Sequence, residues 1–339
     1  MSDIIRRKRS ARYDYAKLFL IACVVFGHIA YTYSSVSPLV GDIQFWVYLF
    51  HMPAFLFICG CFAKRTIREA RWEKIFSYLL IYLFMELLSA GYRWISSGFQ
   101  TVKIDLLHED GVPWFAMSVF LWMSLSVLLR HLPQKPILLL SVLAAVGYGY
   151  APHATSFLSL NRTITFYCFF YLGYMTDPGQ LDKQLERRSI RIGSLMLLLV
   201  TLAFSCYYGS EELWVWKNLF RGHRSYADLG VSCNPCWGGL WRLGAILLSM
   251  MLVLAILALM PQRESLLSGL GSQTLPVFVF HNVILSILFK NVLPVRQWMA
   301  SGDTALKCCV VTCLLVWILC QPPFVRITDW VKRIPMERK

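Results

Sequence analysis

Residues 15–35 read YAKLFLIACVVFGHIAYTYSS, a run in which Lys17 is the one side chain with a formal charge. About 20 apolar residues in an α-helix span the hydrocarbon core of a bilayer, so this run is long enough to cross a membrane. Arginine-rich sequence precedes it, and we identify no small-residue cleavage site of a signal peptide. The run therefore predicts a membrane-spanning helix.

The composition extends this prediction to the whole chain. Of the 339 residues, 57% are hydrophobic and 15% are charged, whereas about a quarter of the residues of a soluble domain are charged. We predict an all-α fold, a polytopic integral membrane helical bundle of about ten transmembrane helices, forming a single domain over residues 1–339. The predicted spans are 15–35, 43–63, 73–93, 112–130, 136–151, 163–177, 191–209, 238–260, 273–293 and 304–321.

The net charge of +14 suggests nucleic-acid binding at first sight. The lysines and arginines, however, gather in short clusters between apolar runs, which is typical of juxtamembrane anchors. This distribution excludes nucleic acid as the favoured partner and leaves membrane lipids. The more basic set of loops includes both ends of the chain. By the positive-inside rule we expect a protein of the cytoplasmic (inner) membrane with both termini in the cytoplasm.

Ionisable groups inside the predicted spans are the candidates for chemistry, because each is costly in a membrane unless it is paired or faces a wet cavity. His28, His51 and Glu86 are expected at similar depth, so they predict a general-base site in which a carboxylate orients an imidazole. Interhelical hydrogen bonding is the alternative, and for Glu86 it is an equal one.

Lys17 lies three helical turns from His28 on the same helix face, about 16 Å along the axis. A lysine at the cytoplasmic end of a span often extends to lipid headgroups. The alternative is a cytosolic anionic ligand, held by Lys17 and the arginine-rich loop 64–74, whose reactive end reaches His28. A nucleotide-headed thioester with a long pantetheine arm fits this second description.

Several motifs in order along the chain carry a resemblance to a known family. The first runs from Arg12 through Asp14 to Lys17 and continues, after ten residues, to His28. The others are His51-Met-Pro53 through Gly60, Arg65-Thr-Ile-Arg68, Pro113-Trp114-Phe115, Arg162 through Gly173, and Ser272-Gln-Thr-Leu-Pro276 leading to His281. Together they resemble the membrane acyltransferase 3 family, in particular its single-domain, fucose 4-O-acetylase-like sugar O-acetyltransferases. Lys17 stands where arginine is usual, and Cys59 where a small hydroxyl residue is usual.

The resemblance implies transfer of an acyl group, usually acetyl, from cytosolic acetyl-CoA to a sugar hydroxyl of a cell-surface or exported glycan at the outer face. It implies His28, and as a second candidate His51, as catalytic residues, to which the shared depth adds Glu86. Lys17, Arg65 and Arg68 would bind acetyl-CoA, although ordinary positive-inside charge is an equal explanation of the two arginines. Asp14 and His281 would be structural or orienting residues. No metal is expected.

The predicted outer side supplies candidates for acceptor binding. Trp114, Arg162 and Arg242 are candidates for contacts with a glycan or lipid-linked sugar, although either arginine is equally a rim anchor. Cys233 and Cys236 form a Cys-x-x-Cys motif on this side. A disulfide or two free thiols are favoured over zinc there, because only His223 is a nearby further ligand.

Two other function classes compete with transfer. A proton-coupled transporter of a glycan or small anion would use His28, His51 and Glu86 as a proton relay. A non-catalytic partner of a glycan-assembly complex would need none of these groups for chemistry. Retention of acetyl-CoA at the cytosolic end separates the transferase from the transporter.

Overall fold

The computed structural model describes residues 10–108, 111–151, 157–229 and 235–335. Helices account for the regular structure of these residues, which contain no named strand. The longer helices are α1 (Ala11–Tyr33), α2 (Pro38–Tyr48), α3 (His51–Arg68), α4 (Trp72–Ser96), α5 (Trp114–Leu128), α6 (Gln134–Tyr148), α7 (Leu160–Met175), α9 (Arg188–Tyr208), α11 (Gly238–Leu259), α13 (Thr274–Ser286), α15 (Thr304–Leu319) and α16 (Pro322–Arg333). The shorter elements are α8 (Pro178–Leu185), α10 (Trp214–Arg221), α12 (Leu266–Gly271), α14 (Leu293–Ala300), the 3₁₀ turns η1 (Ala227–Leu229) and η2 (Pro235–Trp237), and the π-helical η3 (Ile287–Asn291).

This architecture confirms the predicted helical membrane bundle. The predicted number of about ten spans is not confirmed. Within the described residues, six helices are long and apolar enough to cross a membrane, or seven if the pair α15–α16, bent by 61°, is one span. At the positions of three further predicted spans, α5 and α6 have 15 residues each and α7 has 16. These helices are too short to cross a membrane unaided at 1.5 Å per residue.

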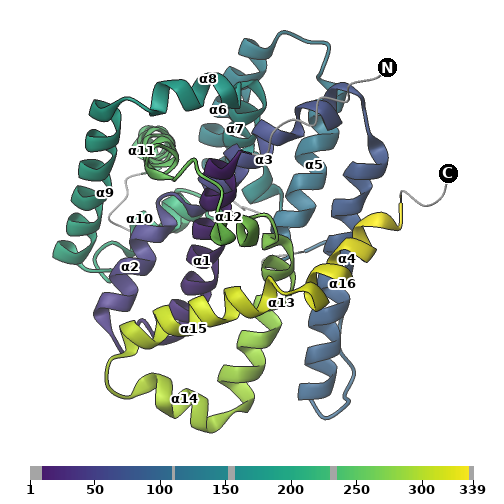
Figure 1. Ribbon diagram of the computed structural model, residues 1–339, viewed down its shortest axis with the longest axis vertical. Coiled ribbons are helices and arrows are strands. Elements are labelled where there is room, and N and C mark those ends of the chain that lie inside the picture. Colours follow the sequence, from purple (N-terminus) through teal and green to yellow (C-terminus); the bar gives the residue numbers. More distant parts are fainter. Residues whose placement is uncertain (1–9, 109–110, 152–156, 230–234, 336–339) are drawn as a thin grey trace.

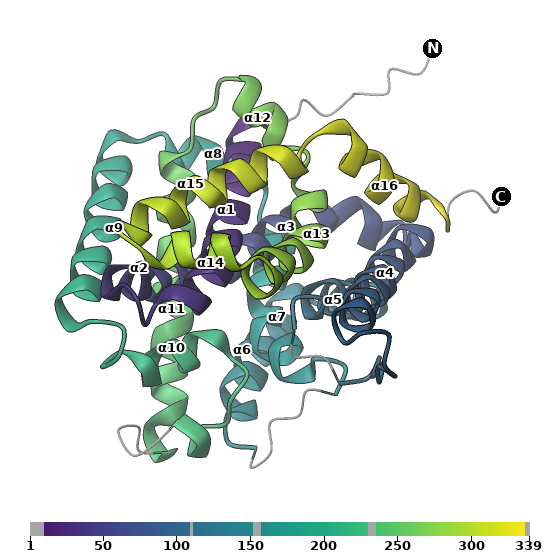
Figure 2. The ribbon, with the colours of Figure 1, turned by 90° about the horizontal axis from the view of Figure 1, so that it is seen from below.

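The first helix lies in the middle of the bundle. Figures 1 and 2 both show α9 along one side of the molecule, α4 and α5 along the opposite side, and α1 between them. α1 packs against α2, α3, α11, α12, α13 and α15. A helix with so many neighbours exposes little of its surface to lipid, so polar groups on α1 face protein or a cavity rather than hydrocarbon.

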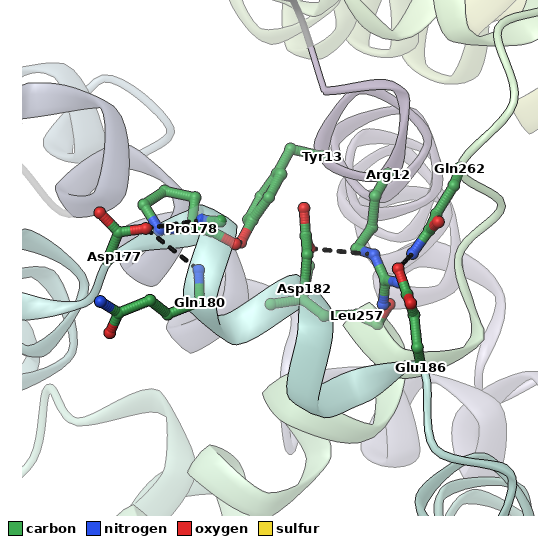
Figure 3. Close-up of polar contacts among 10 residues, drawn as sticks. Arg12, Tyr13, Asp177, Pro178, Gln180, Asp182, Glu186, Leu257 and Gln262 are labelled. Carbon is green, nitrogen blue, oxygen red and sulfur yellow. Dashed lines mark hydrogen bonds and ion pairs between the residues drawn. The ribbon is translucent and has the colours of Figure 1, made fainter.

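Arg12 fixes the beginning of α1 (Figure 3). Its Nη1 donates to the carbonyl oxygen of Leu257 at 2.8 Å, and its Nε lies 3.0 Å from Oδ1 of Asp182 on α8. Burial raises the pKa of Asp182 above its ordinary value, and the neighbouring guanidinium opposes this effect. Three segments far apart in the sequence thus meet at the first turn of α1, which sets the height of Lys17 and His28 in the bundle.

Two glycines allow α3 and α7 to pack closely. A Cβ atom on Gly60 would lie 1.9 Å from the carbonyl oxygen of Phe170, and one on Gly173 would lie 2.0 Å from that of Phe57. Small residues at helix crossings let two backbones approach in this way, which is a main source of helix association in membranes. This crossing holds α3, which carries His51, against α7, which carries Arg162.

Candidate active site

His28 and His51 line one cavity of about 480 Å³, which we call the histidine cavity. Its wall also includes Lys17, Tyr48, Trp114, Arg162, Arg221 and Asn282, together with apolar side chains of α1, α3, α5, α7 and α13. The volume lies within the range of small-molecule sites, and the mixture of apolar walls with a few polar groups is typical of them. The structure therefore brings together the two histidines that the sequence places at one depth.

Pro53 explains how His51 is presented. Proline cannot donate to the carbonyl of the residue four positions earlier, and α2 and α3 are separated at Leu49 and Phe50. The freed carbonyl of Leu49 accepts a hydrogen bond from Oγ of Ser249 at 2.6 Å. The imidazole Nδ1 of His51 lies 2.8 Å from the carbonyl oxygen of Val47. Because a carbonyl only accepts, Nδ1 carries a proton, and in the neutral imidazole the lone pair is then on Nε2.

His281 lies beside His28, with 5.1 Å between the ring centroids. A structural or orienting role is predicted for His281, and the structure places the two rings side by side. His281 is fully buried, and its Nδ1 lies 2.8 Å from the carbonyl oxygen of Val277 and 3.0 Å from that of Phe278. Its Nε2 therefore has a lone pair, and among the described residues this atom has no hydrogen-bond partner.

Glu86 does not lie with these histidines. It is 4% exposed and is not part of the histidine cavity's wall. Its Oε1 accepts no hydrogen bond from the part of the chain that the structure describes. Its position between the buried Met85 and the partly buried Leu88 places it in the packing of α4. The predicted contact between Glu86 and the imidazoles is therefore absent from this arrangement.

A second cavity of about 560 Å³ adjoins the first, and we call it the basic cavity. Both cavities are lined by Lys17, Ile58, Cys59 and Tyr78. The basic cavity adds Lys74, Lys332 and Arg333, with Asp329 as its carboxylate. Nζ of Lys17 lies 2.6 Å from Oδ1 of Asp14, so Asp14 holds the lysine at the junction of the two cavities.

Arg65 and Arg68, which the sequence assigned to the donor, lie outside both cavity walls. Both side chains are exposed, and Nε of Arg65 lies 2.8 Å from Oε1 of Glu69. This hydrogen bond is the main cause that lowers the pKa of Glu69. The cations that line the basic cavity besides Lys17 are instead Lys74, Lys332 and Arg333. In the sequence, Lys332 and Arg333 belong to the basic C-terminal end of the chain, and no spacing indicates that they share a cavity wall with Lys17.

Cations and aromatic rings lie at the end of the histidine cavity remote from Lys74. The guanidinium carbon of Arg162 lies 5.0 Å from the ring centroid of Trp114, and that of Arg221 lies 5.8 Å from that of Tyr48. These are cation–π distances. Tyr48 was missed in the sequence, although it precedes His51 by three residues, and its ring centroid lies 4.9 Å from that of His51.

Lys217 lies outside the wall of the histidine cavity and supports the same end of it through hydrogen bonds. It is 8% exposed, and its Nζ donates to Oε1 of Gln44, whose Nε2 donates to the carbonyl oxygen of Gly27 at 2.7 Å. Burial, assisted by the charge of Arg221, lowers the pKa of Lys217 to about 8. This buried chain of hydrogen bonds ends next to His28.

The remaining predicted residues have other places. Arg242 is 2% exposed, donates to the carbonyl oxygen of Leu219 in α10, and its guanidinium carbon lies 5.7 Å from the ring centroid of Tyr226. It therefore holds α10 and the segment after it and is not part of the cavity wall. Cys233 lies outside the described residues, so the two alternatives for Cys233 and Cys236, a disulfide or two free thiols, both stay open.

Comparisons with known proteins agree with the motifs. A family model described as an acyltransferase domain matches residues 10–321. Nodulation protein NolL of Mesorhizobium japonicum is 25% identical over an alignment of 234 residues, and the alignment covers 63% of this chain and 60% of that protein. The chain thus spans less than two thirds of that relative's length. No solved structure matches the chain. Since the family model covers nearly all of the described helices, the chain belongs to the acyltransferase 3 family, a family of membrane enzymes.

Proposed function

We propose that this protein transfers an acyl group, acetyl in the first instance, from cytosolic acetyl-CoA to a sugar hydroxyl of a cell-surface or exported glycan. The observation that carries the proposal is the pair of adjoining cavities, one basic and one containing His28 and His51, which share Lys17, Ile58, Cys59 and Tyr78. The nucleotide of the donor would occupy the basic cavity and the sugar would enter the histidine cavity from its far end.

The distance along α1 suits such a donor. Lys17 lies at the junction of the cavities, and His28 is three helical turns further along, about 16 Å away. A pantetheine arm extends over this kind of distance. A phosphate-bearing head near Lys17 would therefore bring its thioester to the imidazoles.

The chemistry follows from the histidines. His28 would accept the proton of the sugar hydroxyl while the hydroxyl oxygen attacks the thioester carbonyl carbon. The C–S bond then breaks, and the CoA thiolate leaves and takes up the proton. His51, with its proton on Nδ1, has a lone pair on Nε2. This tautomer supports a role in sharing the proton over one in polarising the carbonyl. Glu86 stays a weaker candidate, since it does not line the cavity.

The far end of the histidine cavity would hold the acceptor. Trp114 and Tyr48 offer aromatic faces on which a sugar ring packs, and Arg162 and Arg221 offer donors to hydroxyl or anionic groups. Arg242 would contribute only by supporting this end. With the basic cavity in the cytosol and this end outside, both termini would be cytoplasmic in an inner membrane.

Purified protein with acetyl-CoA and candidate glycans tests the proposal. We expect CoA release that depends on glycan in the wild type, and a loss of at least about 100-fold in His28→Ala, because general-base catalysis contributes that much. His131→Ala is the matched control, since His131 is exposed and lines neither cavity. Full activity in His28→Ala would contradict the mechanism. Glycan movement across vesicles without CoA release would favour the transporter.

A further inference from the structure

We propose that α16 supplies Lys332 and Arg333 to the phosphate groups of the acyl donor's nucleotide. The proposal rests on acyl-CoA being the donor, and it names the residues that bind the donor's head. The helix begins at Pro322, directly after residue 321, where the region matched by the family model ends. It therefore adds to the basic cavity a wall that lies outside the matched region.

The sequence of α16 explains why this helix lines the basic cavity. Pro322 and Pro323 occupy the first positions of the helix, and the chain bends by 61° between α15 and α16. One face of α16 packs on α4 and α13, with Thr328 2% and Val331 3% exposed. The stripe next to this face carries Asp329, Lys332 and Arg333, all three in the wall of the basic cavity.

The charges in this cavity are unbalanced. Lys74, Lys332 and Arg333 form no ion pair within the described residues, Asp329 included, whereas Arg65 and Arg71 are both paired with Glu69. Three unpaired cations around a cavity of about 560 Å³ form a site for an anion with several charges. Asp329 cannot bind a phosphate, but its carboxylate can accept a hydrogen bond from an amino or hydroxyl group. A nucleotide offers both kinds of group.

The test compares full-length Lys332→Gln/Arg333→Gln protein with wild type in nanodiscs of neutral phosphatidylcholine. Lost charge-assisted hydrogen bonds should raise KM for acetyl-CoA at least about tenfold, with a smaller change in kcat. The penalty should disappear with acetyl-pantetheine, which lacks the nucleotide. Arg326→Gln is the matched control, because Arg326 lies on the exposed face of the same helix, outside the cavity wall.

The outcomes separate this inference from the proposed function. An unchanged KM in the double variant, or an equal penalty with acetyl-pantetheine, would overturn the role of α16 while leaving the transferase intact. An effect seen only when anionic lipid is added to the nanodiscs would assign the two cations to lipid headgroups and would also overturn it. If wild-type protein bound no acetyl-CoA, the proposed function would fail, and this inference with it.

Discussion

Two buried imidazoles in this protein are held in the same way. His51 and His281 each direct Nδ1 to the carbonyl oxygen four residues earlier, Val47 and Val277 respectively. In a helix this carbonyl is the acceptor closest to a histidine ring, so the side chain obtains a fixed tautomer without any charged partner. A neutral carbonyl partner of this kind suits a membrane protein, because a charged partner would be energetically unfavourable inside the bilayer.

His281 is expected to act on His28 as a positioning residue. Its Nε2 lone pair can accept a hydrogen bond from His28, which would leave the other nitrogen of His28 free to take a proton. We predict that His281→Leu lowers kcat by about 10–100-fold, as the loss of an orienting partner does at other sites. His281→Gln should recover part of the rate, because an amide oxygen also accepts.

Steady-state kinetics with acetyl-CoA check this prediction. If His281→Leu and His281→Gln lost activity equally while both eluted as monodisperse protein, His281 would be a packing residue only. Full activity in His281→Leu would remove it from the site altogether.

Lys217 should make stability depend on pH. The pKa of Lys217 is about 8 in the folded protein and about 10.5 ordinarily. As pH falls from about 10.5 to 8, the unfolded chain takes up a proton that the folded protein does not. The free energy of unfolding therefore decreases as the pH falls through this window. Below about pH 8, Lys217 causes no further decrease. The difference corresponds to about 1–3 kcal/mol.

Lys217→Met removes this group. The variant's thermal midpoint relative to wild type should be higher at pH 7.5 than at pH 10, because only the wild type bears the cost of the buried charge at the lower pH. Lys135→Met, at an exposed position, provides the control. If the difference in thermal midpoint between this variant and wild type did not change with pH, burial would not lower the pKa of Lys217.

At the scale of elements, the crossing of α3 and α7 sets the positions of His51 and Arg162 together. The sequence motifs contain Gly60 and Gly173, but one sequence cannot reveal that they face each other. Each glycine lies where a Cβ atom would meet a backbone carbonyl oxygen of the other helix, at 1.9 Å for Gly60 and 2.0 Å for Gly173. Backbone atoms cannot turn away as the end of a side chain can, so the two helices would have to separate.

Gly60→Ala is therefore expected to destabilise the protein by about 1–3 kcal/mol through overpacking, and to weaken acceptor binding by moving His51 from Arg162. Gly91→Ala, in α4, is the matched control, because a Cβ atom there meets nothing within 4 Å. Thermal unfolding in detergent measures the difference. Equal midpoints for the two variants would contradict this packing argument.

The sequence predicts some features of the helices and of the candidate site, and it does not predict others. Apolar length and charge asymmetry predict the bundle, and a shared depth predicts that His28 and His51 meet. The predicted number of about ten spans is not confirmed, because α5 and α6, with 15 residues each, and α7, with 16, are too short to cross a membrane unaided. The arginines of Arg65-Thr-Ile-Arg68 were assigned by pattern, whereas Lys332 and Arg333 reach the basic cavity through the bend before α16, which pattern does not encode.

In the whole molecule, the two cavities meet at four side chains. Lys17, Ile58, Cys59 and Tyr78 line both cavities, whereas His28 lines only the histidine cavity and Lys74 and Arg333 line only the basic cavity. A donor whose head binds on the basic side reaches the acceptor only if its acyl arm passes these four side chains. Transfer across the molecule should thus be sensitive to the size of one residue here.

Cys59→Trp is the change that tests this arrangement, because Cys59 is partly exposed to both cavities and an indole would fill the space between them. We predict at least about a tenfold loss of transfer to glycan, since the thioester no longer reaches His28 in a reactive position. Binding of 3′,5′-ADP, which resembles the donor's head alone, should persist. Cys309→Trp, at an exposed position on α15, controls for the added bulk. Wild-type transfer by Cys59→Trp would mean that donor and acceptor meet by another route, and loss of both transfer and nucleotide binding would mean that the basic cavity is not a separate compartment for the donor's head.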